Sequence, residues 1–230
     1  MEFVFTTENL INMNRLHSNR RRGRVNEDPD VRLSKLLSYA LRHGAVSMGL
    51  PMSSDGFVPV SSLLSLPQFR PFSQSDIERV VRCNDKQRFM LRSSNSEEKL
   101  EIRANQGHSL QVDVALTPLG TDLPSHAIHG TYLRHWSSIL QSGLSRMNRT
   151  HIHLSTQLPS DGEAVISGMR SNCEVAIFID LPKAIADGIP FFWSANRVLL
   201  TPGNADGILL PKYFLQTLQL CPKRRLFPHE

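Results

Sequence analysis

Cysteine, long apolar segments and a secretory leader are scarce or missing in this sequence. Its cysteines, Cys83, Cys173 and Cys221, are widely spaced and form no C-x-x-C pair, which favours free thiols in a reducing compartment over a disulfide framework. No stretch of about 18 uncharged apolar residues occurs, so we expect no transmembrane helix. The first residues lack a basic region followed by an apolar core, so we expect no secretion and a location in the cytosol, the nucleus or both.

Lysine is scarce as well, and the basic residues are mainly arginine. The chain has 20 arginines and 6 lysines. A guanidinium keeps its charge and presents a planar fork of donors that matches two phosphate oxygens at once. This bias is what a phosphate-binding protein would show, although composition can also drift toward arginine for unrelated reasons.

Positive charge is concentrated at the N-terminus. The net charge of the chain is +5, and residues 1–24 supply +3 of it, because five arginines there face only Glu2 and Glu8. This segment is polar and has no sustained periodicity, so we predict that residues 1–27 form a disordered basic arm. The remaining chain is long enough to bury a core divided over one or two domains.

An amphipathic helix is predicted at the start of the folded region. From about Asp30, apolar residues recur at the helical i, i+3, i+4 spacing, and they are Leu33, Leu36, Leu37, Ala40 and Leu41. Arg42 and His43 follow, and Gly44 is a common stop signal. Cationic side chains near a helix C-terminus favour the helix dipole, and this alone would explain Arg42 and His43.

Two more helices and a hairpin are predicted next. A brief helix is expected around residues 61–65, and Ser73, with an aspartate three residues later, resembles a capping box that opens another. Apolar residues alternate near residues 88–92 and 100–104, which predicts two short strands. Three helices followed by a hairpin are typical of a winged-helix lobe that binds nucleic acid, and we place this lobe at residues 28–118.

Short strands dominate after a loop rich in proline and glycine. The expected strands are residues 128–131, 151–154, 175–179, 198–201 and 208–210. One helix, residues 133–141, is expected among them. We place this strand-rich lobe at residues 119–222, followed by a C-terminal tail at residues 223–230, and the fold class is therefore α+β.

Several local motifs combine arginine, histidine and glycine. They are Leu41-Arg42-His43, Lys86-Gln87-Arg88-Phe89, Gln106-Gly107-His108-Ser109, His129-Gly130-Thr131, Arg149-Thr150-His151-Ile152-His153-Leu154 and Ile166-Ser167-Gly168-Met169-Arg170. Together and in this order, they closely resemble the RNA 2′-phosphotransferase family, whose members remove the splice-junction 2′-phosphate from transfer RNA. The resemblance covers residues 30–211, which is most of the chain.

The resemblance implies a fold, a site and partners. It implies an N-terminal winged-helix RNA lobe and a C-terminal NAD lobe related to ADP-ribosyltransferases. The implied catalytic residues are Arg42, His43, Arg88 and Arg149, and the implied NAD-binding residues are His129, Gly130, Thr131, His151, His153 and Ser155. The implied partners are NAD as co-substrate and 2′-phosphorylated tRNA or other RNA, with no metal, no membrane and no obligate protein partner.

The implied reaction has two steps. The RNA 2′-phosphate attacks the nicotinamide ribose of NAD and expels nicotinamide; the ribose 2″-hydroxyl then attacks the phosphorus, giving 2′-hydroxyl RNA and ADP-ribose 1″,2″-cyclic phosphate. A phosphate dianion is already a nucleophile, so the first step needs positioning, which arginines supply. In the second step, fixed guanidinium donors stabilise charge on the equatorial oxygens. His43 is suited to orienting the phosphate or handling a proton near neutral pH.

A missing residue agrees with this chemistry. Many protein-directed ADP-ribosyltransferases use a late glutamate to activate their acceptor. Between Glu174 and Glu230 this chain has no glutamate. An enzyme whose acceptor is an ionised phosphate can dispense with one.

Other interpretations of the same residues stay open. His151 and His153 would share one side of a strand, which suits zinc, although no cysteine or carboxylate lies nearby. His129-x-Thr131 and His153-x-Ser155 match the H-x-[ST] pattern of two-histidine RNA phosphoesterases, which need no NAD, although only 24 residues separate the two motifs. A winged-helix protein with a basic arm could also bind RNA without catalysis, which would leave the second lobe unexplained.

Overall fold

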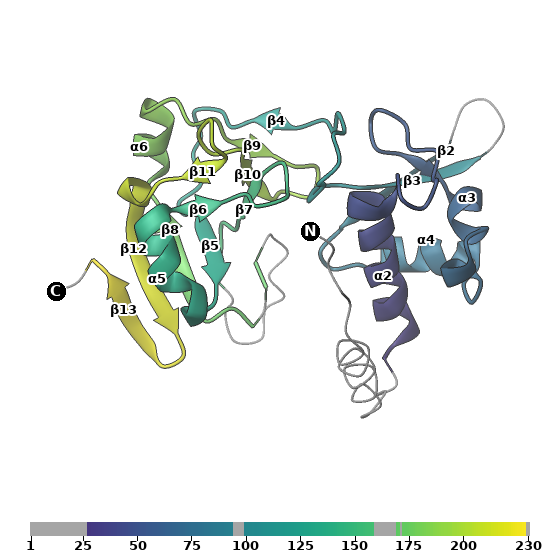
Figure 1. The fold of residues 1–230 in the computed structure, drawn as a ribbon, viewed down its shortest axis with the longest axis horizontal. Helices are drawn as coiled ribbons and strands as arrows, with labels where there is room; N and C mark the ends of the chain where they lie inside the picture. Colours follow the sequence, from purple (N-terminus) through teal and green to yellow (C-terminus); the bar gives the residue numbers. More distant parts are fainter. Residues whose placement is uncertain (1–26, 94–98, 159–168, 171, 229–230) are drawn as a thin grey trace, which may run out of the picture.

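The computed structural model describes residues 27–93, 99–158, 169–170 and 172–228. The predicted basic arm, except for Glu27, lies outside the described residues. Helices and strands both occur, which confirms the predicted α+β class. Among the described residues, two large hydrophobic cores form, one from residues between Leu33 and Ala104 and the other from residues between Ala127 and Phe214, and a smaller third cluster includes Ile128, Met169 and Phe178. The helices and strands that contribute to the two large cores lie at opposite sides of the molecule (Figure 1). In the part of the chain described here, no helix is both long and apolar enough to cross a bilayer.

The first core is built on the predicted N-terminal helix. Helix α2 (Pro29–Tyr39) begins at Asp28, whose side chain accepts the N–H of Asp30 at 2.8 Å, and its buried face includes Leu33 and Leu37. The structure adds a feature that the apolar spacing does not predict. The chain continues into a π-helical turn, η1 (Ala40–Gly44), and such turns occur frequently at functional sites.

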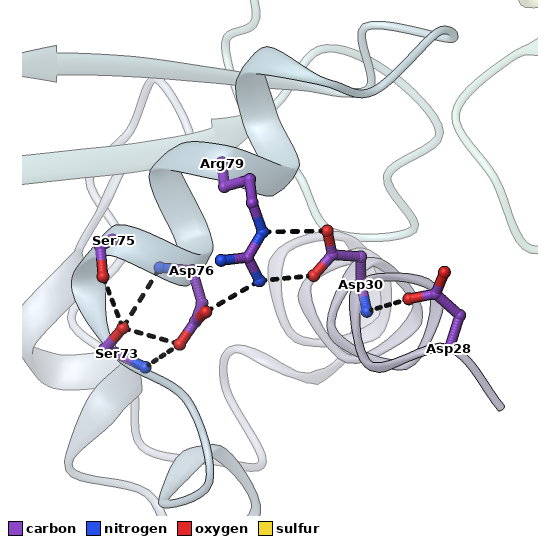
Figure 2. A network of polar contacts seen from close by, with 6 residues as sticks. All are labelled: Asp28, Asp30, Ser73, Ser75, Asp76 and Arg79. Atoms are coloured by element: carbon purple, nitrogen blue, oxygen red, sulfur yellow. Dashed lines mark hydrogen bonds and ion pairs between the residues drawn. The ribbon is translucent and has the colours of Figure 1, made fainter. Parts of the chain in front are cut away.

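A polar network fixes α2 against a second long helix. Helix α4 (Gln74–Arg82) opens with the predicted capping box, in which Ser73 accepts the Asp76 N–H at 3.3 Å and donates its own N–H to the Asp76 carboxylate at 2.8 Å. Figure 2 shows Arg79 of α4 reaching both Asp76 and Asp30, with nitrogen–oxygen distances of 2.8 and 2.7 Å. Because Asp30 belongs to α2, these contacts join the N-terminal turns of both helices to one guanidinium.

A small antiparallel sheet completes the first core. Helix α3 (Val60–Leu64) and a 3₁₀ turn, η2 (Pro67–Phe69), connect to α4, and the sheet has the order β1-β3-β2. Its strands are β1 (Val58–Pro59), β2 (Phe89–Ser93) and β3 (Leu100–Ala104). The β2–β3 register pairs Phe89 with Ala104 and Leu91 with Ile102, as the predicted hairpin requires.

The second core lies between antiparallel sheets and short helices. One sheet has the order β13-β12-β8-β5, with β5 (Ile128–Thr131), β8 (Val175–Ile179), β12 (Phe214–Leu220) and β13 (Lys223–Phe227). Another has the order β4-β9-β10-β7, with β4 (Thr117–Pro118), β9 (Phe192–Trp193), β10 (Leu199–Thr201) and β7 (Ile152–Leu154). A two-stranded sheet pairs β6 (Leu144–Ser145) with β11 (Ile208–Leu209). The helices are α5 (Leu133–Ser142), α6 (Leu181–Ala186) and the 3₁₀ turn η3 (Pro211–Tyr213).

The five predicted strands and the predicted helix of this region are present, but the C-terminal segment differs from the expected tail. Residues 223–227 form β13, which pairs with β12 across four residue pairs from Thr217 to Leu220. The three consecutive basic residues at 223–225 looked like a solvated tail. They are exposed, as expected, and the backbone of this edge strand is nevertheless paired on one side.

Candidate active site

The four residues predicted to be catalytic come from three separate segments. Arg42 and His43 lie on η1, Arg88 immediately precedes β2, and Arg149 lies between β6 and β7. Burial and the nearby positive charges of Arg88 and Arg149 lower the pKa of Arg42 to about 10. The pKa of His43 is also lowered, by burial and then by Arg149 and Arg42. The fold therefore brings these four cationic or titratable groups together.

Arg42 carries a largely buried charge, and two of its guanidinium nitrogens have no hydrogen-bond partner among the described residues. Its Nε and Nη2 atoms are buried and form no hydrogen bond with the described residues. The backbone of Gly107 packs against this guanidinium, since a Cβ there would lie 3.4 Å from Nε, and the φ of +88° at this position also favours glycine. Unsatisfied buried donors of a charged group are costly, so an anion at this position would satisfy a requirement that the folded chain leaves open.

The arginines of the site differ from other arginines of this chain in their ion pairs. Within the described ranges, none of Arg42, Arg88 and Arg149 pairs with a carboxylate, whereas Arg79 and Arg92 each contact two. Arg88 and Arg149 both lower the pKa of the buried Arg42, so this cluster of positive charge is unfavourable unless an anion binds among the guanidinium groups. The electrostatics of the site therefore favour a ligand with several negatively charged oxygens, such as a phosphate.

His43 is held by a residue from the first core. Its Nδ1 lies 3.0 Å from the Ser109 hydroxyl, and the Ser109 N–H donates to the Arg42 carbonyl at 3.0 Å. The ring is exposed, and its lowered pKa keeps it neutral at pH 7. A neutral, oriented imidazole at the rim of an arginine cluster can exchange a proton with a bound substrate.

Arg88 follows a tight turn that several contacts stabilise. Gln87 has a φ of +42°, and its carbonyl accepts the Asn105 side-chain amide at 2.7 Å. The Asn84 side chain accepts from both the N–H of Arg88, at 3.3 Å, and its Nη1, at 3.5 Å. These contacts fix the direction in which the half-buried guanidinium leaves the start of β2.

Arg149 is held from within its own loop. Its N–H donates to the Arg146 carbonyl at 3.1 Å, and Nη1 of Arg146 donates to the Arg149 carbonyl at 2.7 Å. Burial of the guanidinium and the positive charge of Arg170 lower the pKa of Arg149. The second core thus contributes a cation to a cluster whose other arginines belong to the first.

Two of the predicted NAD-binding histidines form a chain with a glutamine. His153 is buried on β7 and donates from Nε2 to Oε1 of Gln106 at 2.6 Å, while its carbonyl accepts Nδ1–H of His129, on β5, at 3.1 Å. Burial, and then the charges around it, lower the pKa of His153 to about 3. Both imidazoles are neutral at pH 7, and His129 keeps Nε2 as an acceptor because its Nδ1 must donate to a carbonyl.

Gly130 and Thr131 are held tightly on β5. A Cβ at Gly130 would lie 2.4 Å from Cγ of Met169 and 3.1 Å from Sγ of Cys173, so no larger residue fits. Thr131 is buried, and its carbonyl accepts the N–H of Glu174 at 2.8 Å. For Gly130 this close packing is a structural reason for the glycine, which the sequence motif alone did not reveal.

His151 and Ser155 are engaged elsewhere. Nδ1 of His151 contacts the Thr150 hydroxyl at 2.9 Å, and its ring meets the Phe192 ring edge-on at 6.1 Å. The Ser155 hydroxyl donates to the Gln157 carbonyl at 2.7 Å. These contacts are local, and both residues also lie near the His129–His153 pair: Ser155 pairs through its backbone with Ile128, the neighbour of His129, and His151 is among the groups that lower the pKa of His153.

The alternative uses of these histidines receive little support. No group of three metal-ligating side chains occurs among the described residues, and the nitrogens of His151 and His153 that form contacts are bound to Thr150 and Gln106. Burial and nearby positive charges lower the pKa of His153, which disfavours the protonated ring that an acid and base pair with His129 would need near neutrality. Two-histidine phosphoesterase chemistry is therefore disfavoured.

Several residues at the site had no predicted role. Gln106 and Ser109 lie in a motif that the sequence marks out without a function, and the structure shows that they contact His153 and His43. Asn196 donates to the Lys86 carbonyl at 3.0 Å and so joins the two cores behind Arg88. No sequence signal points to Asn196, because its partner is 110 residues away.

Comparisons with known proteins identify relatives of most of the chain. A family model described as RNA 2′-phosphotransferase, Tpt1 / KptA family, matches residues 28–203, which include every predicted site residue. A Mus musculus protein named tRNA 2′-phosphotransferase 1 is 61% identical over 202 residues, covering 86% of this chain and 81% of its own. A Danio rerio protein of the same name is 58% identical over 209 residues, covering 88% and 92%. The tRNA 2′-phosphotransferase of Saccharomyces cerevisiae is 41% identical over 182 residues, covering 75% and 78%.

Proposed function

This chain belongs to the RNA 2′-phosphotransferase, Tpt1 / KptA family, and from this premise we propose that it transfers the 2′-phosphate of spliced tRNA, or of another internally 2′-phosphorylated RNA, to NAD. The products are RNA with a 2′-hydroxyl, nicotinamide and ADP-ribose 1″,2″-cyclic phosphate. The observation that carries this proposal is the Arg42 guanidinium, whose buried donors have no partner among the described residues and which lies beside Arg88 and Arg149.

We assign RNA binding and NAD binding to different cores. We assign residues 28–118 to a winged-helix RNA lobe, because α2, α3 and α4 are followed by the β2–β3 hairpin. We assign the strand-rich region from residue 119 to an ADP-ribosyltransferase-like lobe that binds NAD. Its last strand, β13, extends this lobe beyond residue 222 to Phe227.

The residues near β5 and β7 fit NAD by their chemistry. Arg149 and Arg170 are close enough for one to lower the pKa of the other, and neither pairs with a carboxylate among the described residues, so a pyrophosphate would match them. His129 offers a neutral acceptor beside them. NAD supplies a ribose carbon made reactive by the nicotinamide leaving group.

The chain's own residues bind and orient the phosphate. Arg42 and Arg88, from the first core, hold its oxygens, and Arg149, from the second core, stabilises the negative charge that develops on the equatorial oxygens of phosphorus. His43, neutral at pH 7 and fixed by Ser109, handles a proton at the rim of this cluster. The reaction needs both cores because the guanidinium groups come from both.

A product assay separates this proposal from its rivals. A short 2′-phosphorylated RNA is incubated with and without NAD, and the RNA and nucleotide products are resolved by chromatography. The proposed enzyme needs NAD and forms the cyclic phosphate. Release of inorganic phosphate or strand cleavage without NAD would point to a phosphoesterase, and RNA binding without turnover would leave an RNA-binding protein.

A further inference from the structure

The segment Gln106–Ser109, which follows β3, contacts the site from both cores. Gln106 accepts from His153 at 2.6 Å, and the His108 carbonyl accepts the Thr150 N–H at 3.1 Å. Gly107 packs against the Arg42 guanidinium, and Ser109 contacts His43 at 3.0 Å. Each of these four residues therefore contacts a predicted site residue or, at Thr150, the immediate neighbour of one.

The Ser109 end of this segment acts on the phosphate side. The Ser109 hydroxyl has one hydrogen, which it directs to the Arg42 carbonyl at 3.4 Å, so its oxygen accepts Nδ1–H of His43 at 3.0 Å. This pattern selects one tautomer and leaves Nε2 of His43 as a proton acceptor. Besides this hydrogen bond, the exposed ring has a tilted contact with the Tyr39 ring, with the centroids 6.3 Å apart, and that contact does not select a tautomer.

The Gln106 end acts on the NAD side. Gln106 Oε1 accepts from the buried His153 ring, and the His153 carbonyl in turn receives Nδ1–H of His129. Loss of the glutamine oxygen would leave a buried N–H without an acceptor and free the His153 ring to turn. This loss of orientation would extend from His153 to His129 on β5, and the position of His43 on η1 would not change.

We propose that Gln106 and Ser109 are positioning residues, Ser109 for His43 at the phosphate and Gln106 for the His153–His129 pair at NAD. This inference rests on the proposed function. Their effects separate kinetically. A misoriented His43 lowers kcat and leaves KM for NAD unchanged. A His153 ring that is free to turn raises KM for NAD and leaves kcat unchanged.

The first experiment measures kcat and KM for NAD at saturating 2′-phosphorylated RNA. Ser109→Ala should lower kcat about tenfold with KM for NAD within about twofold, and Ser109→Thr should restore most of the loss because it keeps the hydroxyl. Gln106→Leu should raise KM for NAD about tenfold with little change in kcat, and Gln106→Glu, which keeps an acceptor, should restore most of it. The matched controls are Ser61→Ala and Gln74→Leu, which replace exposed residues on α3 and α4 and should behave as the wild type.

A second readout does not depend on activity. In ¹⁵N-histidine spectra, the His43 ring signals, identified by their loss in His43→Ala, should shift in Ser109→Ala and stay in place in Gln106→Leu. The His153 ring signals should show the reverse pattern. Wild type that forms no product with NAD would defeat the proposed function, and the spectra would still decide the positioning of both rings.

Some results would overturn the inference. Unchanged kinetics and unchanged His43 signals in Ser109→Ala would remove the role of Ser109. Equal losses in Gln106→Leu and Gln106→Glu, or losses that follow a lowered melting temperature in every variant, would show that the segment supports only the fold.

Discussion

Replacing Arg42 with methionine should make the protein more stable and inactive. Burial and like charge lower the pKa of this guanidinium to about 10, from an ordinary value above about 12. The unfolded chain therefore holds this proton more tightly than the folded chain, and the charge destabilises the folded state at every pH below 10. At about 1.4 kcal/mol for each pKa unit, the destabilisation is about 3 kcal/mol at neutral pH, and it begins to fall as the pH passes 10 and is gone only above the ordinary arginine pKa.

Methionine fills a similar volume without charge or unsatisfied donors. For a chain of this size, about 3 kcal/mol corresponds to a melting temperature higher by roughly 6 to 12 °C. Imperfect packing of the new side chain will reduce the gain, so we expect a rise of at least about 3 °C. Activity should fall at least about 100-fold, because donors to the phosphate are lost.

The assay is thermal unfolding by circular dichroism in a buffer free of phosphate and sulfate, together with the product assay. Arg79→Met is the matched control, because Arg79 is exposed and pairs with Asp30 and Asp76. It should leave activity unchanged and leave or lower the melting temperature. A 2′-phosphorylated oligonucleotide should raise the melting temperature of the wild type and not that of Arg42→Met. A less stable Arg42→Met, or equal stabilisation of both proteins by the oligonucleotide, would refute the reasoning.

Three further changes test other parts of the site. Arg149→Ala should slow the attack on phosphorus more than the first step, by about 10² to 10³, so ADP-ribosylated RNA should accumulate as a slower gel band; equal loss of both steps without this band would contradict the role. Folded His108 and His153 have pKa values of about 4 and about 3, so stability should fall as the pH drops below about 6.5 and be lower by roughly 2 to 3 kcal/mol at pH 5.5 than at pH 7. Urea titrations measure this difference, and His153→Gln should remove about half of it, whereas an unaltered difference would locate the effect elsewhere. Gly130→Ala should lower the urea midpoint because its Cβ would lie 2.4 Å from a buried methionine, whereas Gly120→Ala, with nothing within 4 Å, should not; equal midpoints would argue against the tight packing of β5.

Local sequence patterns predicted most elements because local physics determines them. The capping box at Ser73 and the alternation in β2 and β3 depend on neighbours within a few residues, and the structure confirms both. The π-helical turn could not be predicted, since the apolar spacing that ends at Leu41 is the same for a regular helix. β13 was missed because its three basic residues conceal a strand whose pairing partner is β12.

The catalytic and NAD-binding roles of the site residues stay predictions, and the contacts among these residues could not be predicted from the sequence. The motif resemblance named Arg42, Arg88 and Arg149, and the structure places their charges within range of one another. The contacts that orient the site residues are tertiary. Gln106 and His153 are in hydrogen-bond contact although 47 positions separate them in the sequence, and 66 positions separate Ser109 from His43. No periodicity in the sequence contains these pairings.

The basic edge strand β13 affects how copies of this protein behave at high concentration. The sheet that carries His129 on β5 at one end exposes β13 at the other, and an unpaired strand edge is a template on which a second copy can add its own strand. Lys223, Arg224 and Arg225 are exposed on that edge, and two such edges would repel each other. Residues 223–225 lie beyond the region matched by the family model. Like charge at residues 223–225 therefore opposes edge-to-edge pairing of this sheet with that of a second copy.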